Sequence, residues 1–141
     1  MAHTESNIFG QVERIHTSLL LSGTPETVRI ALSSQEHNLA QIELQNLEIR
    51  RGLGRKVLQM EVIDLSGMPE YLNSPGSSQL KIHLGHTAII GRGRLGLPIL
   101  ELASVSQNHI ELSFSQGENG YQLGIHDQDS VNGSHQINPQ S

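Results

Sequence analysis

The sequence predicts an all-β protein, an antiparallel β-sandwich with little or no helix. Short segments in which apolar and polar residues alternate recur along the chain, which is the pattern of strands that bury one face. Clusters of Gly, Pro, Asn and Ser separate these segments, and no long helical repeat interrupts them. With 141 residues, the chain is long enough for one domain with a continuous core.

Composition limits how this domain is stabilised. Two Phe, two Tyr and no Trp leave Leu, Ile and Val to fill the core, and the absence of Cys excludes disulfides and thiolate metal sites. Among the eight His, only His83 and His86 are close in sequence, and no carboxylate frames them as a metal site requires. We therefore expect no metal and no cofactor.

The N-terminal third contains weaker signals. Val12 and Ile15 have the spacing of a short helix, whereas residues 27–32 alternate as a strand does. Residues 39–49 also alternate, but the apolar phase slips by one residue near Gln45 and Asn46, which predicts a β-bulge there. The Arg-Arg-Gly-Leu-Gly-Arg-Lys segment at 50–56 is interpreted as a solvated basic loop.

The alternation is clearest from Val57 onward, where Leu58, Met60 and Val62 face one way, as in a half-buried antiparallel strand. A loop is expected over 66–78 because this segment contains Pro and Gly. Further strands are expected over 80–84, 87–90, 98–102, 110–114, 121–125 and 136–138.

Charge and hydropathy restrict the classes of partner. A formal net charge of −5 argues against a nucleic-acid-binding surface, and the longest aliphatic run, residues 19–21, cannot span a bilayer. The N-terminus has no secretory pattern. We expect a soluble, cytoplasmic protein that binds neither nucleic acid nor membrane. Four of the nine Lys and Arg lie in residues 50–56, however, so a local positive patch is expected.

Three polar blocks interrupt the second half of the chain. They are Gly91-Arg92, then Ser106-Gln107-Asn108-His109, then Ser130-Val131-Asn132-Gly133. In order and separation they resemble the Gly-Arg, Ser-x-x-His and Ser-x-Asn-Gly motifs of the forkhead-associated (FHA) domain, a β-sandwich that binds phosphothreonine peptides. The resemblance covers residues 57–138.

The resemblance implies a phosphopeptide site. Arg92 would donate to the phosphate, Ser106 would add a hydroxyl, and Asn132 would bond the main chain of the peptide. Gln107 stands where many members carry a basic residue, and Val131 where some carry Thr. His109 is expected to be structural and not to point into the core. The implied binding residues are Arg92, Ser106, Gln107, Val131 and Asn132, with structural support from Gly91, His109, Ser130 and Gly133.

The chain also departs from the family pattern, because the family continues through further strands after the last motif. Residues 1–56 hold strand candidates without a counterpart in the family, so we expect them to pack onto the sandwich and replace those strands. The expected organisation is N-terminal strands at 1–56, the FHA-like region at 57–138 and a tail at 139–141.

Other motifs give weaker hypotheses. The run Gly91-Arg92-Gly93-Arg94-Leu95-Gly96 fits the dinucleotide fingerprint, but the Pro98 that follows denies it the required helix. Asp127 and Asp129 are interpreted as caps of backbone N–H groups and not as a catalytic pair. No Gly-x-Ser-x-Gly signature is present, so an enzyme is not expected.

Two functional hypotheses follow. In the first, the protein is a signalling adaptor that binds a phosphothreonine-containing protein and acts downstream of a Ser/Thr kinase. In the second, a degenerate FHA-like scaffold acts as a structural or assembly protein without phosphopeptide binding. Its free sheet edges would then pair with a partner or with another copy of the chain.

Overall fold

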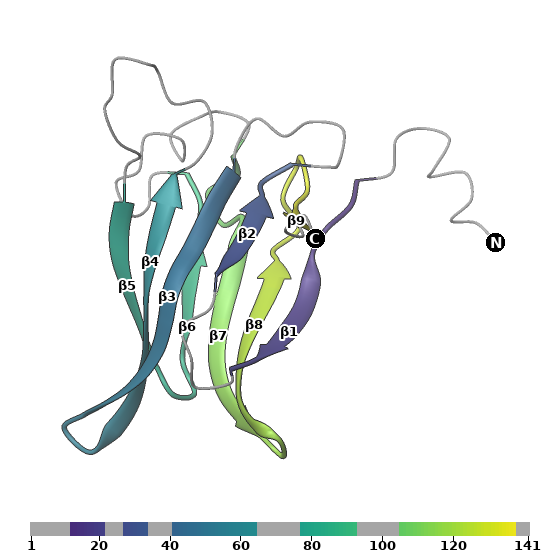
Figure 1. The fold of residues 1–141 in the computed structure, drawn as a ribbon. Coiled ribbons are helices and arrows are strands. Elements are labelled where there is room, and N and C mark those ends of the chain that lie inside the picture. Colours follow the sequence, from purple (N-terminus) through teal and green to yellow (C-terminus); the bar gives the residue numbers. More distant parts are fainter. Residues whose placement is uncertain (1–11, 22–26, 34–40, 65–76, 93–104, 138–141) are drawn as a thin grey trace.

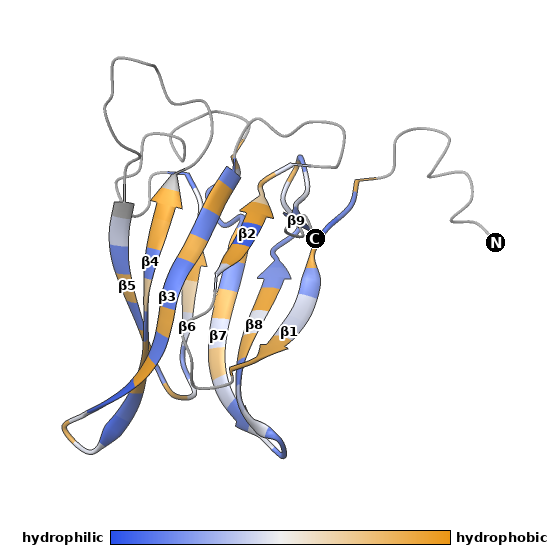
Figure 2. Cartoon of the chain, viewed as in Figure 1, coloured by the Kyte–Doolittle hydropathy of each residue, from blue (hydrophilic) through white to orange (hydrophobic). Residues whose placement is uncertain are grey.

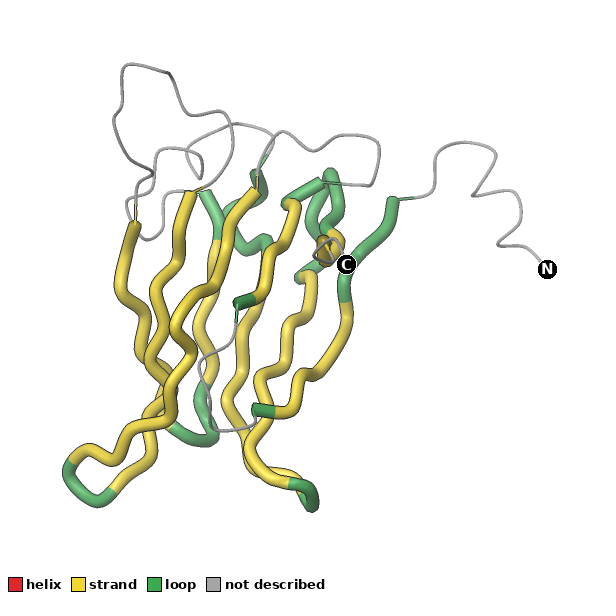
Figure 3. The backbone as a smooth tube through the Cα atoms, in the orientation of Figure 1, coloured by secondary structure: helices red, strands yellow, loops and turns green. Residues whose placement is uncertain are grey.

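We describe the fold from a computed structural model, for residues 12–21, 27–33, 41–64, 77–92 and 105–137. Within these ranges the chain forms nine strands and no helix (Figure 3). The strands are β1 (His16–Leu20), β2 (Val28–Ala31), β3 (Gln41–Gly52), β4 (Arg55–Asp64), β5 (Ser77–His83), β6 (Thr87–Ile90), β7 (Ile110–Gly117), β8 (Gly120–Asp127) and β9 (His135–Ile137). The predicted all-β class is confirmed.

The strands form two antiparallel sheets. The smaller sheet has the order β1-β8-β7-β6, and the larger has the order β5-β4-β3-β2-β9. Figure 1 shows the two sheets stacked face to face. The predicted antiparallel β-sandwich is therefore confirmed.

The core lies between the two sheets, where the alternating apolar residues of each strand face inward. Leu58, Met60 and Val62 of β4 are buried, as the alternation predicted, and Leu112 and Phe114 of β7 are buried within the same cluster. Figure 2 shows the resulting bands of apolar and polar residues along β3. Burying each such side chain stabilises the fold by up to about 3 kcal/mol, so aliphatic packing is the main stabilising term.

The predicted β-bulge is confirmed in β3. The register between β3 and β4 shifts between Gln45 and Glu48, and Asn46 has a φ of 54°. Leu44 and Leu47 both face the core, although an odd spacing would send them to opposite faces of a regular strand. One extra residue in β3, with Asn46 exposed, returns Leu47 to the core side.

Strands from the first 56 residues lie in both sheets. β1 pairs with β8, with Leu19 opposite Leu123, and β2 lies between β3 and β9, with Arg29 opposite Ile137. The expected short helix at Val12 and Ile15 is wrong. Ile15 is buried just before β1, and its carbonyl accepts a hydrogen bond from the Asp127 N–H, which extends the β1–β8 pairing.

The loop expected at 50–56 is also wrong, because most of it belongs to a long hairpin. β3 continues to Gly52 and β4 begins at Arg55, so only Leu53 and Gly54 form the turn. Their φ angles of 50° and 80° suit a two-residue turn whose twist matches that of the flanking strands. Both strands are exposed here, so cross-strand hydrogen bonds form the hairpin without the apolar alternation that would predict it.

Some expectations fall on other parts of the chain. The expected strand at 98–102 and the tail at 139–141 lie outside the described residues, as does most of the loop expected at 66–78. Ser77 and Ser78, the last residues of that expected loop, belong to β5. None of the described segments is a helix with the length and hydropathy needed to cross a membrane.

A fragment that begins at Val57 should fail to fold. It lacks β1, β2 and β3, so β8, β4 and β9 lose hydrogen-bonded neighbours and the core loses Ile30, Ile42 and Leu44. We expect a poorly dispersed amide NMR spectrum and no cooperative melting, with the full chain under the same conditions as control. A dispersed spectrum with a cooperative transition would mean that residues 1–56 are dispensable for the core.

Candidate functional site

The three polar blocks meet at one end of the sandwich. β6 ends just before Gly91, β7 begins just after His109, and β8 ends three residues before Ser130. In Figure 1 these three strand ends lie at the same end of the molecule, opposite the β3–β4 hairpin. Loops that are distant in sequence therefore form one cluster, which we call the loop cluster.

Hydrogen bonds join the three blocks directly. The Arg92 N–H donates to the Ser106 carbonyl at 2.9 Å, and the His109 N–H donates to the Ile90 carbonyl at 3.1 Å. The Ser106 Oγ accepts from the Val131 N–H at 3.1 Å, which links the second block to the third. A hydroxyl that accepts through its oxygen still has its O–H to donate. Ser106 can therefore offer a donor to a ligand where the blocks meet.

Gly91 is required by the close approach of the first two blocks. A Cβ at this position would lie 2.1 Å from the Gln107 carbonyl oxygen and 2.6 Å from that of Ser106. Both atoms belong to the backbone, so no side-chain rotation relieves the contact. Any larger residue must push the Ser-x-x-His block away from the end of β6.

His109 is buried between the second and third blocks. The structure corrects the expectation that its ring points away from the interior, because the residue is 0% exposed. Its Nδ1 accepts from the Ser106 N–H at 3.0 Å, and its Nε2 lies 2.7 Å from the Gly133 carbonyl. A carbonyl only accepts, so Nε2 carries the proton and the ring is neutral.

The environment of His109 favours this neutral form. Burial lowers the pKa of His109 below its ordinary value of 6.5, although the bond to the Gly133 carbonyl and the charge of Asp127 act in the opposite direction. A second proton on Nδ1 would also remove the acceptor for the Ser106 N–H. The ring therefore acts as an uncharged bridge between two loops.

Asp127 organises the third block. Its side chain is 0% exposed, and its oxygens accept from the Ser130 N–H at 2.7 Å, the Ser130 hydroxyl at 2.6 Å and the Ser134 hydroxyl at 2.5 Å. The expectation that Asp127 caps a backbone N–H group is thus confirmed. Three donors compensate for removing the carboxylate from water, which is costly otherwise.

Ser130 and Gly133 close the turn of the third block. The Ser130 Oγ donates to Asp127 and accepts from the Gly133 N–H at 3.0 Å. Gly133 has a φ of 82°, a left-handed conformation that glycine adopts without steric cost. Both residues are buried, whereas Val131 and Asn132 between them are exposed. The turn therefore presents the middle of the Ser-x-Asn-Gly block to solvent.

The N-terminal segment also holds this turn, which the sequence did not indicate. The Arg14 Nε and Nη2 donate to the Ser130 carbonyl at 3.0 and 2.8 Å, and Nε lies 3.9 Å from the Asp127 carboxylate. The Ser134 N–H donates to the Glu13 carbonyl at 2.8 Å, and the Ser134 Oγ accepts from the Ile15 N–H at 3.3 Å. Residues 13–15 therefore form one wall of the loop cluster.

The five residues expected to contact a phosphopeptide all belong to the loop cluster. Arg92 and Ser106 are half-buried, Gln107 and Asn132 are exposed, and Val131 is 74% exposed. Arg92, Gln107 and Asn132 also interact with other residues of the chain. The cluster thus combines a guanidinium, a hydroxyl and surface amides, which are donors suited to an anion with several acceptor oxygens.

No group of three or more His, Asp or Glu in the described ranges could hold a metal ion. Comparisons of the chain with protein-family models, with curated proteins and with solved structures found no match.

Substitution of Gly91 by Ala should destabilise the protein by about 1–3 kcal/mol, the usual cost of overpacking a well-packed site. The new methyl group would meet the backbone of Gln107. Gly52→Ala is the matched control, because a Cβ there has no atom within 4 Å and the change should stay within about 0.5 kcal/mol. Chemical denaturation measures both variants, and equal stabilities would show that the two blocks are not in close contact.

The stability contributed by His109 should depend on pH. Its pKa in the folded protein is below 6.5, so the contribution is complete above pH 6.5 and is lost as the pH falls through the folded value. The difference in unfolding free energy between the wild type and His109→Gln should be constant at higher pH and shrink below 6.5. A difference that grows on acidification would mean that the ring binds its proton more readily in the folded state.

Proposed function

We propose that the protein is a phosphothreonine-peptide-binding adaptor module. The observation that carries the proposal is the hydrogen bond from the Val131 N–H to the Ser106 Oγ, which brings the Ser-x-x-His and Ser-x-Asn-Gly blocks into contact. The backbone bond between Arg92 and Ser106 adds the Gly-Arg block. The proposal is supported because an arginine, a serine and an asparagine-containing turn lie in one loop cluster.

A phosphothreonine side chain carries a charge of about −1.5 to −2 and three acceptor oxygens. Arg92 supplies a forked cationic donor, and the Ser106 O–H supplies a second donor. Asn132 follows the exposed Val131 and is itself exposed. In this proposal its amide bonds the main chain of a bound peptide. We expect micromolar affinity, or about −8 kcal/mol, and a partner phosphorylated by a Ser/Thr kinase.

His109 and Asp127 have no direct contact with the ligand in this proposal. Their role is to preorganise the loops: His109 bonds to Ser106 and Gly133, and Asp127 bonds to Ser130 and Ser134. A loop that is ordered before binding loses less conformational entropy when the ligand binds, which increases affinity. The amount of buried polar bonding around an exposed turn supports a binding role for that turn.

Arg92→Ala should weaken phosphopeptide binding by at least about tenfold, because it removes charge-assisted hydrogen bonds. Asn132→Ala should weaken binding less, since it removes neutral bonds to the peptide main chain. Calorimetry with a phosphothreonine peptide and its unphosphorylated counterpart measures both effects. Arg55→Ala is the control for charge, because the exposed Arg55 begins β4 at the opposite end of the sandwich.

Unchanged affinity in Arg92→Ala would exclude Arg92 as the phosphate anchor, and a larger loss in Asn132→Ala would exchange the two roles. Equal binding of the phosphorylated and unphosphorylated peptides would favour the second hypothesis, a scaffold for assembly. One observation supports that alternative: Val131 is an exposed apolar residue at the tip of the turn and offers no hydroxyl to a phosphate.

A further inference from the structure

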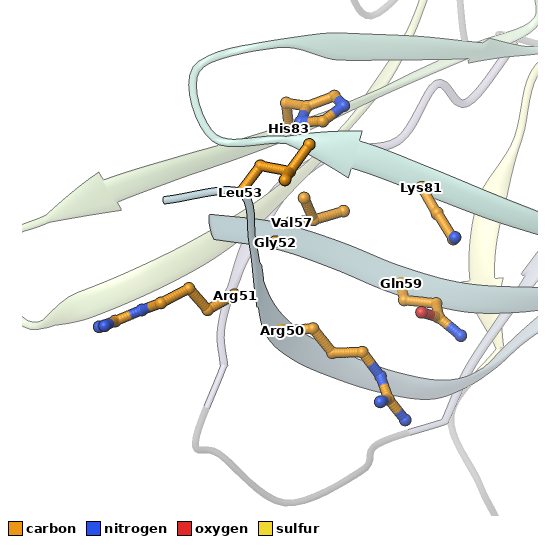
Figure 4. A pocket seen from close by; sticks show the side chains of 8 residues that line it. All are labelled: Arg50, Arg51, Gly52, Leu53, Val57, Gln59, Lys81 and His83. Atoms are coloured by element: carbon orange, nitrogen blue, oxygen red, sulfur yellow. The ribbon is translucent and has the colours of Figure 1, made fainter. Parts of the chain in front are cut away.

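A hollow opens on the outer face of the larger sheet, near the β3–β4 hairpin. It has a volume of about 400 Å³ and is lined by residues of β3, β4, β5 and the hairpin turn (Figure 4). Its polar side chains are Arg50, Arg51, Gln59, Lys81 and His83, and its apolar ones are Leu53 and Val57. It lies at the end of the sandwich opposite the loop cluster.

The strand register explains why most of these residues share one face, whereas Arg51, which directly follows Arg50, extends to the other side (Figure 4). Val57 is paired with Arg50 on one side and with His83 on the other, and Lys81 is paired with Gln59. Their neighbours Leu58 and Ile82 are buried in the core, so this set faces outward. Figure 4 shows Arg50, Gln59 and Lys81 extending to the same side.

The hollow is positive in a protein that is negative as a whole. None of its lining residues in the described part of the chain is acidic, whereas the chain has a net charge of −5. Among the described residues, Arg51 and Lys81 have no ion-pair partner, and Arg50 is paired with Glu48 at 2.7 Å, where both side chains are substantially exposed. A concentration of unpaired cations in a concave surface attracts anionic groups.

The hairpin turn adds an apolar contact. Leu53 is fully exposed and has a φ of 50°, a left-handed conformation that Asn, Asp or Gly adopts more readily at this position of a two-residue turn. A strained, exposed leucine gives nothing to the core, so its side chain is available to a ligand. Leu53 and Val57 together offer an apolar contact, so we expect a ligand that carries aliphatic as well as acidic side chains.

We propose that the hollow binds an acidic peptide segment of a partner protein, in which carboxylates are interspersed with aliphatic side chains. The segment is not phosphorylated in this proposal, and its binding does not depend on the loop cluster. The carboxylates contact Arg50 and Lys81, and an aliphatic side chain packs against Leu53 and Val57. Charge complementarity favours an acidic segment, and the apolar contact with Leu53 and Val57 fixes the position of that segment along the hollow.

Other anionic partners fit the hollow less well. Base stacking on a single-stranded nucleic acid uses aromatic side chains, and no Phe, Tyr or Trp lines the hollow within the described ranges. Membrane binding needs an apolar surface that enters the bilayer beside the basic residues, but the cations here line a concave face with one exposed leucine at its rim. A peptide can follow a concave surface that a bilayer cannot.

Glu48 has a specific part in this proposal. Its carboxylate occupies Arg50 in the free protein, so a carboxylate of the ligand competes with it for the same guanidinium. Removing the charge of Glu48 should therefore increase affinity. This gain is informative because a variant that merely disturbs the fold would reduce binding.

The test uses the full chain and a fluorescein-labelled, unphosphorylated peptide in which Glu and Leu residues are mixed, measured by fluorescence anisotropy. Lys81→Glu should weaken binding by at least about fivefold, and Glu48→Gln should tighten it by about twofold, the range expected for exposed charges. Arg92→Ala is the control, because it removes a cation at the other end of the sandwich. It should leave binding of the acidic peptide unchanged while weakening phosphopeptide binding.

Binding should also weaken as salt is raised. Thermal melting shows whether Lys81→Glu remains folded, and if it does not, Glu48→Gln and Arg50→Ala decide the question. Unchanged binding in these variants, or no binding of the acidic peptide, overturns the proposal. Tighter binding to phosphatidylserine vesicles or to a single-stranded oligonucleotide, sensitive to the same substitutions, assigns the hollow to that ligand and overturns the peptide. Loss in Arg92→Ala alone places the acidic peptide at the loop cluster.

Discussion

The candidate site depends on the hydrogen bonds that the buried carboxylate of Asp127 accepts. A charge removed from water destabilises the folded state unless hydrogen bonds or an ion pair replace its hydration. Here the Ser130 N–H and hydroxyl and the Ser134 hydroxyl bond to its oxygens, and Arg14 lies 3.9 Å away. These donors come from two segments, the Ser-x-Asn-Gly turn with Ser134 and the residues just before β1. Both segments must be folded for the carboxylate to be hydrogen-bonded, so its burial fixes the conformation of both.

The sequence was most informative where residues face the core. In β4 and β7, side-chain burial imposes a period of two that can be read directly, and in β3 the slip of one residue between Leu44 and Leu47 revealed the bulge. The signal failed where burial is weak. β1 is an edge strand whose residues are alternately exposed and half-buried, and its place is set by pairing with β8, more than 100 residues later. The ends of the β3–β4 hairpin are exposed on both faces, so they resembled a loop.

Some residues of the candidate site could also be predicted from local sequence, whereas others are brought there only by the fold. Gly91, Ser106 and His109 belong to motifs that can be recognised in sequence, and the spacing of Asp127 and Ser130 is that of a side chain capping the N–H three residues later. Arg14 carries no such signal, because it contacts Ser130 across 116 positions of sequence. Only the pairing of β1 with β8 brings it there. The burial of His109 was missed for a related reason: it precedes β7 and bonds to Ser106 and Gly133, so strand alternation does not report its burial.

The two proposed sites lie at opposite ends of the sandwich, the loop cluster at strand ends of the smaller sheet and the hollow on the larger sheet. This separation limits how they can influence each other. The ten residues of β4 span about 30 Å, and its hydrogen-bonded ladders to β3 and β5 are continuous apart from the bulge. Conformational coupling between two sites requires an element that has two arrangements, each favoured by one or both ligands. In the described residues, antiparallel strands held in register by a packed core connect the sites, and we see no such element. One partner that carries a phosphothreonine and an acidic segment would gain affinity by tethering alone, provided that about ten extended residues separate the two. Two different partners would bind independently, and the domain would then act as a rigid connector between them.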